Sequence, residues 1–323
     1  MDDPRPVSEL KPSLQDRLEY LLLRMVGFFV GLLPRSFALL CARPLGIVAF
    51  DIVRFRRRIT LENLEHAFPE KSRAERTRIG RAAFVNLALV VMEMLRAFRM
   101  TRERVLSLVQ VDSESESLYH RLVEGGRGVI FVGGHYSTWE FLAARVAATG
   151  YPTLIIVQDQ RNPLVNRDLI ETRRKLGFLI TGRGQAVRSV LKTLKDGGTV
   201  GILADQDAGP DYGLFVDFFD RPASAYQGPA VFAVRSGAPV LAGWIHREGS
   251  SYRAGYERLD EEALADLPAD AGEEVRIRRL TEAYLRWLEG RIRMDPSQYL
   301  WQHRRWKSRP GQDRDRVEDR NED

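Results

Sequence analysis

The middle of the chain alternates short apolar runs with helical segments, and glycines close several of the runs. Gly128-Val-Ile-Phe-Val132 is followed by Gly133-Gly134, which predicts a buried strand that enters a turn. The same reasoning predicts strands over 151–157, 178–180, 199–203 and 240–246 and helices over 138–149, 163–176, 186–194 and 227–235. Strand and helix units that alternate at this length predict an α/β fold with a central mixed, partly parallel sheet flanked by helices.

The regions on either side are more helical in pattern. Residues 59–124 carry apolar residues at helical spacing, and a helix is also predicted over 273–294. Residues 251–259 alternate apolar and polar side chains, which predicts an edge strand. From Gly311 on, Val317 is the sole apolar residue among many charged ones, so we expect disorder. The predicted organisation is a tail (1–17), a helical anchor (18–50), one α/β domain (51–310) and a disordered charged tail (311–323).

The predicted anchor is apolar but interrupted. Between Leu18 and Phe50, three arginines break the pattern, and the longest clean run is Met25 to Pro34. That run is shorter than the roughly 20 residues that a membrane-spanning helix needs. The segment is better interpreted as an amphipathic or re-entrant helix that lies in the membrane interface, with arginine side chains reaching outwards. A tilted single span and a plain core helix are the alternatives.

Charge is mildly basic and unevenly placed. The formal net charge is +5, and basic residues gather over 54–58 and again over 303–309. Such clusters suit phospholipid head groups or nucleic acid, or form a solvated face. Because they flank apolar segments and no nucleic-acid-reading module is recognisable, nucleic-acid binding is not favoured. Cys41 is the only cysteine, which excludes an internal disulfide and fits a reducing compartment.

The segment after the first predicted strand carries the strongest chemical signal. Ser137-Thr-Trp-Glu140 matches a capping box, in which Ser137 caps the next helix and Glu140 folds back towards the cap. Glu140 then either caps the helix and does nothing else, or also places its carboxylate beside His135. In the second case it fixes the tautomer of the imidazole, which is left free to take a proton from an alcohol. Ligand sites in α/β sheets lie at the carboxyl ends of strands, where His135 is expected.

Five ordered motifs then indicate a family. His135-Tyr-Ser-Thr-Trp-Glu140 resembles the His, four residues, Asp or Glu motif of glycerolipid-type acyltransferases. The flanking sequence resembles more narrowly the lipid A biosynthesis acyltransferases, the late lauroyl and myristoyl transferases of Gram-negative bacteria. The resemblance spans about residues 20–310 and rests further on Leu203-Ala-Asp-Gln-Asp-Ala-Gly209, Phe215-Val-Asp-Phe-Phe219, Gln227-Gly-Pro-Ala230 with Ser236-Gly-Ala-Pro-Val240, and Tyr299-Leu-Trp-Gln-His-Arg-Arg-Trp-Lys-Ser-Arg-Pro310.

The resemblance implies an O-acyltransferase at the cytoplasmic face of the bacterial inner membrane. The acyl thioester, carried on acyl carrier protein or coenzyme A, is a co-substrate, the acceptor is a glycolipid such as a lipid A precursor, and neither a cofactor nor a metal is needed. His135 is then the catalytic base and Glu140 orients it.

The other motifs supply candidate substrate-binding residues. Arg174 and Arg183 are candidates for holding a phosphate, because the planar guanidinium suits that group; each is otherwise a surface charge. Asp205 and Asp207 read alone resemble a metal-ligand or acid/base pair, and within the family pattern the Asp205-Gln206-Asp207 turn shapes the site. Arg304 and Arg305 follow an aromatic series, so they either bind substrate or belong to an interfacial anchor.

One departure from the family pattern concerns the acceptor. Many relatives carry Arg four residues before the Asn-Pro that follows the second strand, whereas Gln158 stands there in this chain and Arg161 lies next to Asn162-Pro163. This difference keeps other acceptors open: a phosphatidylinositol mannoside, a lysophospholipid or an aminolipid. A non-catalytic lipid-binding protein that keeps the fold is a further alternative, against which the intact His135 and Glu140 argue.

Overall fold

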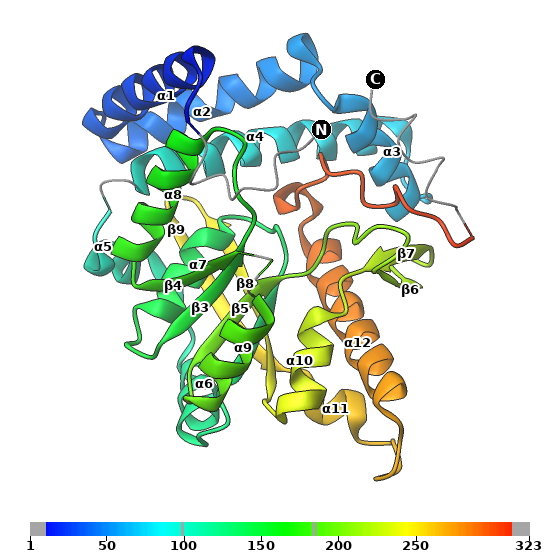
Figure 1. Cartoon of the computed structure of the whole chain (residues 1–323). Coiled ribbons are helices and arrows are strands. Elements are labelled where there is room, and N and C mark those ends of the chain that lie inside the picture. The colour runs from blue at the N-terminus through cyan, green and yellow to red at the C-terminus, as the bar shows by residue number, and fades with distance from the viewer. Residues whose placement is uncertain (1–10, 98–99, 183, 185, 312–323) are drawn as a thin grey trace.

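The computed structural model of the chain describes residues 11–97, 100–182, 184 and 186–311 (Figure 1). It has an α/β fold with a seven-stranded sheet whose order is β1-β9-β8-β2-β5-β3-β4. The strands are β1 (Val109–Val111), β2 (Val129–Gly133), β3 (Thr153–Val157), β4 (Phe178–Gly182), β5 (Thr199–Leu203), β8 (Val240–Glu248) and β9 (Ser251–Arg258). The predicted fold class is therefore confirmed.

The sheet is mostly parallel. Only β8 and β9 pair antiparallel, because a short turn joins them, and the other neighbours are parallel. The prediction that 251–259 is an edge strand is wrong, since β1 adds to the outer side of β9 and forms that edge. The sequence pattern did not separate β1 from the helices around it, because three residues are too short to show a strand period.

Alternating side chains of β2 supply both faces of the sheet. Val129 and Phe131 belong to a buried cluster on one face, and Ile130 and Val132 belong to the cluster on the other. The first cluster includes residues of α5 (Arg102–Leu108), α6 (Ser113–Glu124) and α7 (Trp139–Ala147). The second includes residues of α9 (Ala186–Lys195), α10 (Gly228–Ser236) and α12 (Glu273–Met294). Helices on both faces explain why β2 is apolar throughout, as buried parallel strands are.

The N-terminal helices form a layer above one end of the sheet (Figure 1). They are α1 (Leu14–Leu32), α2 (Arg35–Val48), its π-helical extension η2 (Ala49–Val53), α3 (Arg57–Ala67) and the long α4 (Arg73–Ala97). Gly46 lets α2 approach α4 closely, because a Cβ at this position would lie 2.5 Å from the Val85 Cα. One described stretch, Arg35–Val53, is long and apolar enough to cross a membrane by length and composition.

Three further helices and a small hairpin complete the described chain. They are α8 (Pro163–Lys175), α11 (Asp260–Leu264), the 3-10 turn η4 (Pro296–Gln298) and the antiparallel pair β6 (Leu214–Asp217) and β7 (Pro222–Ala225). The hairpin was not predicted from the sequence, and it covers the α12 side of the core through Val216 and Ala223. The expected disorder over 311–323 falls, apart from residue 311, outside the described residues.

Candidate active site

The site lies where β2 and β5 end side by side. These strands are parallel neighbours, and Gly133 at the end of β2 is in register with Leu203 at the end of β5. His135 follows the end of β2 by two residues, and Asp205 follows the end of β5 by two residues. The register therefore brings the two side chains together at the carboxyl edge of the sheet, which is the usual ligand-binding edge of such sheets.

Asp205 binds His135 twice. The imidazole Nδ1 lies 2.7 Å from Asp205 Oδ1, and the His135 backbone N–H donates to Oδ2 over 2.9 Å. The Asp205 side chain is 2% exposed and that of His135 is 18% exposed. Because a carboxylate only accepts hydrogen bonds, Nδ1 must carry the proton, which leaves Nε2 with a lone pair. This is the tautomer that a general base requires.

The two side chains shift each other's pKa values. Burial lowers the pKa of His135, but the charge and hydrogen bond of Asp205 and the charge of Glu140 outweigh it, so that the pKa lies above its ordinary value of 6.5. Burial raises the pKa of Asp205, but the charge of His135 and the hydrogen bonds that the carboxylate accepts from His135 and from backbone N–H groups outweigh burial. The pKa of Asp205 therefore lies below its ordinary value of 3.8. Asp205 is thus the ionised partner at neutral pH, and it stabilises an imidazolium as one forms.

Glu140 does not take the position that we expected from the sequence. It forms an ion pair with Arg173 of α8, with 2.5 Å between Arg173 Nη2 and Glu140 Oε1. Its effect on His135 is electrostatic, through the raised pKa. The hypothesis that Glu140 orients the imidazole is therefore corrected: Asp205 orients it, because the ends of adjacent strands bring Asp205 to Nδ1.

The predicted capping box is also wrong. Helix α7 begins at Trp139 with Thr138 as its N-cap, and no side chain caps it. Ser137 is buried in the left-handed region at φ 51°, and its Oγ has no hydrogen-bond partner in the described residues. The Ser137 N–H instead donates to the Gln298 carbonyl over 2.7 Å. A distant backbone segment, rather than a local cap, therefore sets this turn.

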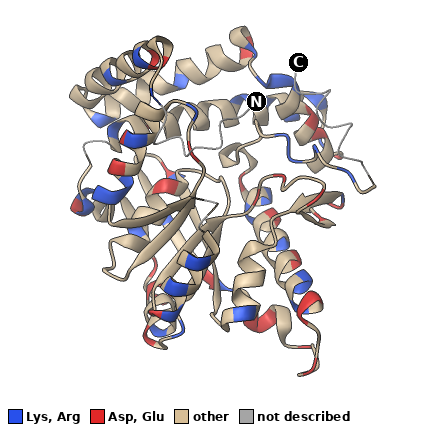
Figure 2. Ribbon diagram, in the orientation of Figure 1, with Lys and Arg blue, Asp and Glu red and all other residues tan. Residues whose placement is uncertain are grey.

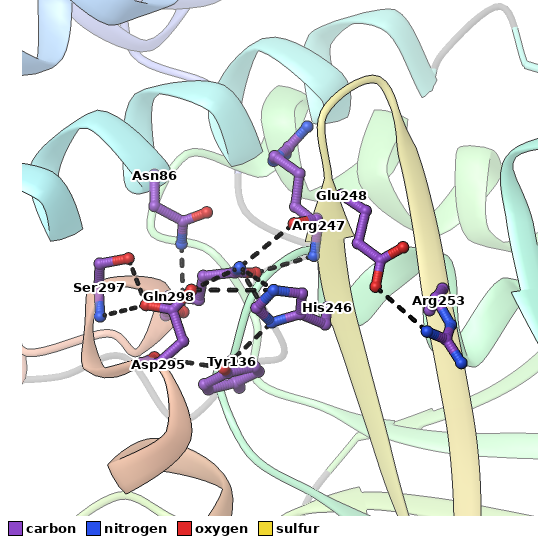
Figure 3. Close-up of polar contacts among 9 residues, drawn as sticks. All are labelled: Asn86, Tyr136, His246, Arg247, Glu248, Arg253, Asp295, Ser297 and Gln298. Atoms are coloured by element: carbon purple, nitrogen blue, oxygen red, sulfur yellow. Dashed lines mark hydrogen bonds and ion pairs between the residues drawn. The ribbon is translucent and has the colours of Figure 1, made fainter.

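Gln298 of η4 holds that segment against the sheet and α4 (Figure 3). Its side-chain amide contacts His246 and Asp295, and its Oε1 accepts the Arg247 backbone N–H over 2.9 Å. Asn86 of α4 donates to the Gln298 backbone carbonyl over 3.1 Å. Two residues on, the Leu300 N–H donates to the His135 carbonyl over 3.0 Å. The backbone from His135 to Ser137 is thus fixed by residues 298–300.

A narrow cavity adjoins His135. The Trp139 ring lies against the imidazole, 4.9 Å between ring centroids, and the rest of the wall is mostly apolar. The lining residues are Ala83, Asn86, Leu87, Val90, His135, Trp139, Gln298, Tyr299, Leu300 and Gln302. Both amide atoms of the buried Gln302 have no partner in the described residues. The site therefore offers an apolar wall and one unsatisfied amide beside the base.

The other predicted substrate-binding residues fall into different surroundings. Arg174 is exposed on the last turn of α8, and Arg183 lies outside the described residues. Gln206 is half-buried in the turn after Asp205, and Asp207 accepts from the Ser308 backbone N–H and hydroxyl, which anchors the C-terminal segment. Asp207 therefore does not join Asp205 on the imidazole.

Arg304 and Arg305 differ sharply although they are neighbours. Arg304 lines an open groove, whereas Arg305 is 1% exposed and donates to the Ser224 carbonyl. The Arg305 guanidinium is buried over the Phe218 ring, so it does not belong to an exposed interfacial anchor, and its role in substrate binding stays a prediction. The sequence shows two adjacent arginines, and only the path of the backbone decides which one faces outwards.

Sequence reasoning did not single out Arg173, Gln302 or His303. Burial lowers the pKa of His303 to about 4, so it is neutral near pH 7, and its Nε2 accepts the Asp207 backbone N–H. The charges of Asp205 and Asp207 oppose that shift, and burial outweighs them. Asp205 was singled out as a residue that shapes the site but not as the partner of His135; the signal for that role is that it stands two residues beyond a predicted strand, as His135 stands three beyond another.

The fold and the site together define an α/β protein in which the buried Asp205 holds a partly exposed His135 at the carboxyl edge of the sheet. Residues 11–308 match the family model described as bacterial lipid A biosynthesis acyltransferase. The chain belongs to this family and is an O-acyltransferase.

Relatives over most of the chain agree. The chain is 30% identical to the lipid A biosynthesis lauroyltransferase of Escherichia coli K12 over 271 residues, which cover 82% of this chain and 84% of the relative. It is 28% identical to the palmitoleoyltransferase of the same organism over 268 residues, 82% and 83% of the two chains. A lipid A biosynthesis acyltransferase of Haemophilus influenzae is 25% identical over 260 residues, 79% and 78% of the two chains.

Proposed function

We propose that this enzyme transfers a fatty acyl chain from an acyl carrier protein thioester to a hydroxyl of a lipid A precursor or a related glycolipid. The observation that carries the proposal is the His135–Asp205 pair at the ends of β2 and β5, with the family assignment setting the reaction class. Leu87, Val90 and Leu300 make the surroundings of His135 partly apolar, which limits the access of water to the base.

The chemistry follows from the tautomer. His135 Nε2 takes the proton of the acceptor hydroxyl as its oxygen attacks the thioester carbonyl, and a tetrahedral oxyanion forms. The carbon–sulfur bond then breaks, the thiolate leaves with the proton from the imidazolium, and an ester remains. Asp205 keeps Nδ1 protonated and balances the transient positive charge over 2.7 Å. Glu140, held by Arg173, adds negative charge that favours the imidazolium.

We further propose that α1, α2 and η2 lie in the cytoplasmic interface of the inner membrane. Their large apolar side chains are exposed in a row, among them Leu22, Phe29, Leu40 and Ile52, each more than half exposed. Helix α2 buries Ala38, Leu39 and Ala42 as it runs along α4. A helix that packs lengthwise on the catalytic domain presents one face to lipid, which favours an interfacial position over a span.

A second candidate acceptor stays open because of one contact. Gln158 is exposed, and the nearby Arg161 pairs with Glu19 of α1 over 2.8 Å instead of pointing to the site. Arg173 is then the cation beside Glu140. Because Gln158 stands where many relatives carry an arginine, a lysophospholipid, an aminolipid or a phosphatidylinositol mannoside is kept as an alternative acceptor.

One assay tests these proposals. Purified full-length enzyme is incubated with acyl carrier protein and coenzyme A thioesters and with a panel of these acceptors, and wild type is compared with His135→Ala. We expect turnover on a phosphorylated glycolipid with the carrier-protein donor, and a loss of at least about 100-fold in the variant. Turnover that survives the substitution contradicts the general-base role, and no turnover on any acceptor favours a non-catalytic lipid-binding protein.

A further inference from the structure

A second, strongly cationic site lies beside the catalytic one. It is a groove of about 810 Å³ where the start of α3 meets the C-terminal segment, and we call it the cationic groove. Figure 2 shows Lys and Arg gathered at this corner of the molecule. The groove is lined by Arg54, Phe55, Arg56, Arg58, Ile59, His303, Arg304 and Lys307. Five of these eight side chains are cationic and none is acidic, so the groove attracts anions.

The backbone of the groove is held in an unfavourable conformation. Arg54 and Arg56 both lie in the left-handed region, at φ 58° and 53°. A non-glycine residue there is strained, and such residues concentrate at binding sites. Arg56 is also the N-cap of α3, and no side chain caps that helix. The N–H groups of its first turn, near Arg58 and Ile59, therefore add positive potential to the same groove.

The cationic groove is connected to the catalytic site. The Arg56 guanidinium donates to the Gln302 carbonyl over 3.2 Å, while the Gln302 side chain lines the cavity at His135. His303, the next residue along the chain, lines the groove. Because burial lowers the pKa of His303 to about 4, its imidazole is neutral at pH 7 and adds no charge to the groove. Residues 302 and 303 thus face the two neighbouring sites, Gln302 the cavity at His135 and His303 the groove.

The rim next to the groove is apolar. Ile52, Val53 and Phe55 are 73%, 65% and 67% exposed, and they continue the exposed apolar face of α2. Cations beside exposed hydrocarbon fit a ligand that has an anionic head and apolar chains. An acidic protein surface would leave these exposed apolar side chains without an apolar partner.

We propose that the cationic groove binds a phosphate group of the lipid acceptor and so positions the acceptor hydroxyl at His135. The inference rests on the proposed acyl transfer to a lipid, but the groove's binding preference exists without turnover. A phosphate monoester carries up to two negative charges and accepts several hydrogen bonds, which matches a groove of guanidinium groups.

The binding test uses the full-length chain with His135→Ala, so that no lipid is consumed. The probe is a phosphatidylcholine vesicle that contains a minor fraction of phosphatidic acid, with pure phosphatidylcholine vesicles as reference. The groove variant Arg58→Gln/Lys307→Gln removes two exposed cations from the groove. The matched control Arg188→Gln/Lys195→Gln removes two exposed cations from α9.

We expect the groove variant to lose about 30-fold in affinity for phosphatidic acid vesicles, about 2 kcal/mol at 1.4 kcal/mol per tenfold, and the control to lose little. Inorganic phosphate should compete only weakly, because it lacks the chains that the rim receives. Equal losses in both variants would show general surface attraction and overturn the proposal. So would inorganic phosphate that competes as strongly as the lipid.

Kinetics separate this inference from the proposed function. With His135 intact, the groove variant should raise KM about 30-fold for a diphosphorylated lipid A precursor, leave kcat within twofold, and leave KM unchanged for the same lipid after its phosphates are removed. If KM rises equally for both lipids, or only for acyl carrier protein, the phosphate assignment is wrong while the acyl transfer stands. If neither lipid turns over although the vesicle preference holds, the proposed function fails and the groove stands.

Discussion

Replacing Asp205 by asparagine tests the site most directly. Both carboxylate oxygens of Asp205 accept from His135, one from Nδ1 and one from the backbone N–H. An asparagine has one acceptor oxygen and one NH₂ group, so it cannot accept both bonds. Either the backbone N–H loses its acceptor, or the NH₂ group donates to Nδ1 and moves the imidazole proton to Nε2. In the second case His135 can no longer act as the base.

The size of the effect follows from these bonds. A hydrogen bond to a charged group contributes about 1.5–3 kcal/mol, and 3 kcal/mol corresponds to about 150-fold in rate. The same exchange in a Ser-His-Asp triad lowers kcat by about 10⁴-fold, because it leaves the wrong tautomer. We therefore expect Asp205→Asn to lower kcat by about 10² to 10⁴-fold with little change in KM. Glu140→Gln, which removes a charge but no bond to His135, should cost about tenfold.

The assay is the initial rate of acyl transfer to the lipid acceptor, with circular dichroism to verify folding of each variant. Asp217→Asn is the matched control, since Asp217 is an exposed aspartate on β6. An Asp205→Asn enzyme within threefold of wild type would refute the orienting role of Asp205. A complete loss in Glu140→Gln together with a mild effect at Asp205 would restore the assignment first made from the sequence.

Three more predictions follow from the structure. The imidazole of His135 must be neutral to accept a proton, and its pKa lies above 6.5, so kcat/KM should fall tenfold per pH unit below a midpoint that itself lies above pH 6.5. Glu140→Gln should move that midpoint to lower pH, and a wild-type midpoint below pH 6.5 would contradict the charge argument. Glu93 is fully buried against Arg35, Arg247 and Tyr252, so Glu93→Gln should lower the free energy of unfolding by about 3–5 kcal/mol in denaturant titrations. The control Glu248→Gln, at an exposed residue, should lower it by less than about 1 kcal/mol, and equal losses would contradict a stabilising role for the buried ion pairs. Gly46→Ala should lower the free energy of unfolding by about 1–3 kcal/mol in thermal unfolding, because the new Cβ would overlap the backbone of α4. In the control Gly290→Ala the new Cβ meets nothing within 4 Å, so the protein should not be destabilised. A Gly46→Ala protein as stable as wild type would mean that α2 does not pack on α4 as described.

Much of the fold could be predicted from local pattern. The strands that became β2, β3, β4, β5 and β8 and the helices between them were found within a few residues, because apolar periodicity and glycine stops act over short stretches. β1 was missed because it is short, and the position of β9 was wrong because strand order depends on contacts between distant segments. The β6–β7 hairpin was missed for the same reason, since Val216 and Ala223 are held by the α12 side of the core.

The site divides in the same way. The sequence by itself determined that His135 stands at the carboxyl end of a buried strand, behind two glycines, with an acid five residues further on. Only the tertiary structure decided which carboxylate lies at Nδ1 of His135. The nearest acid in the chain, Glu140, turns to Arg173, while Asp205, seventy residues away, reaches Nδ1 because β2 and β5 are paired in register. Helix and strand signals are local, but a hydrogen bond between two loops depends on which strands become neighbours, and that is settled by packing of the whole core.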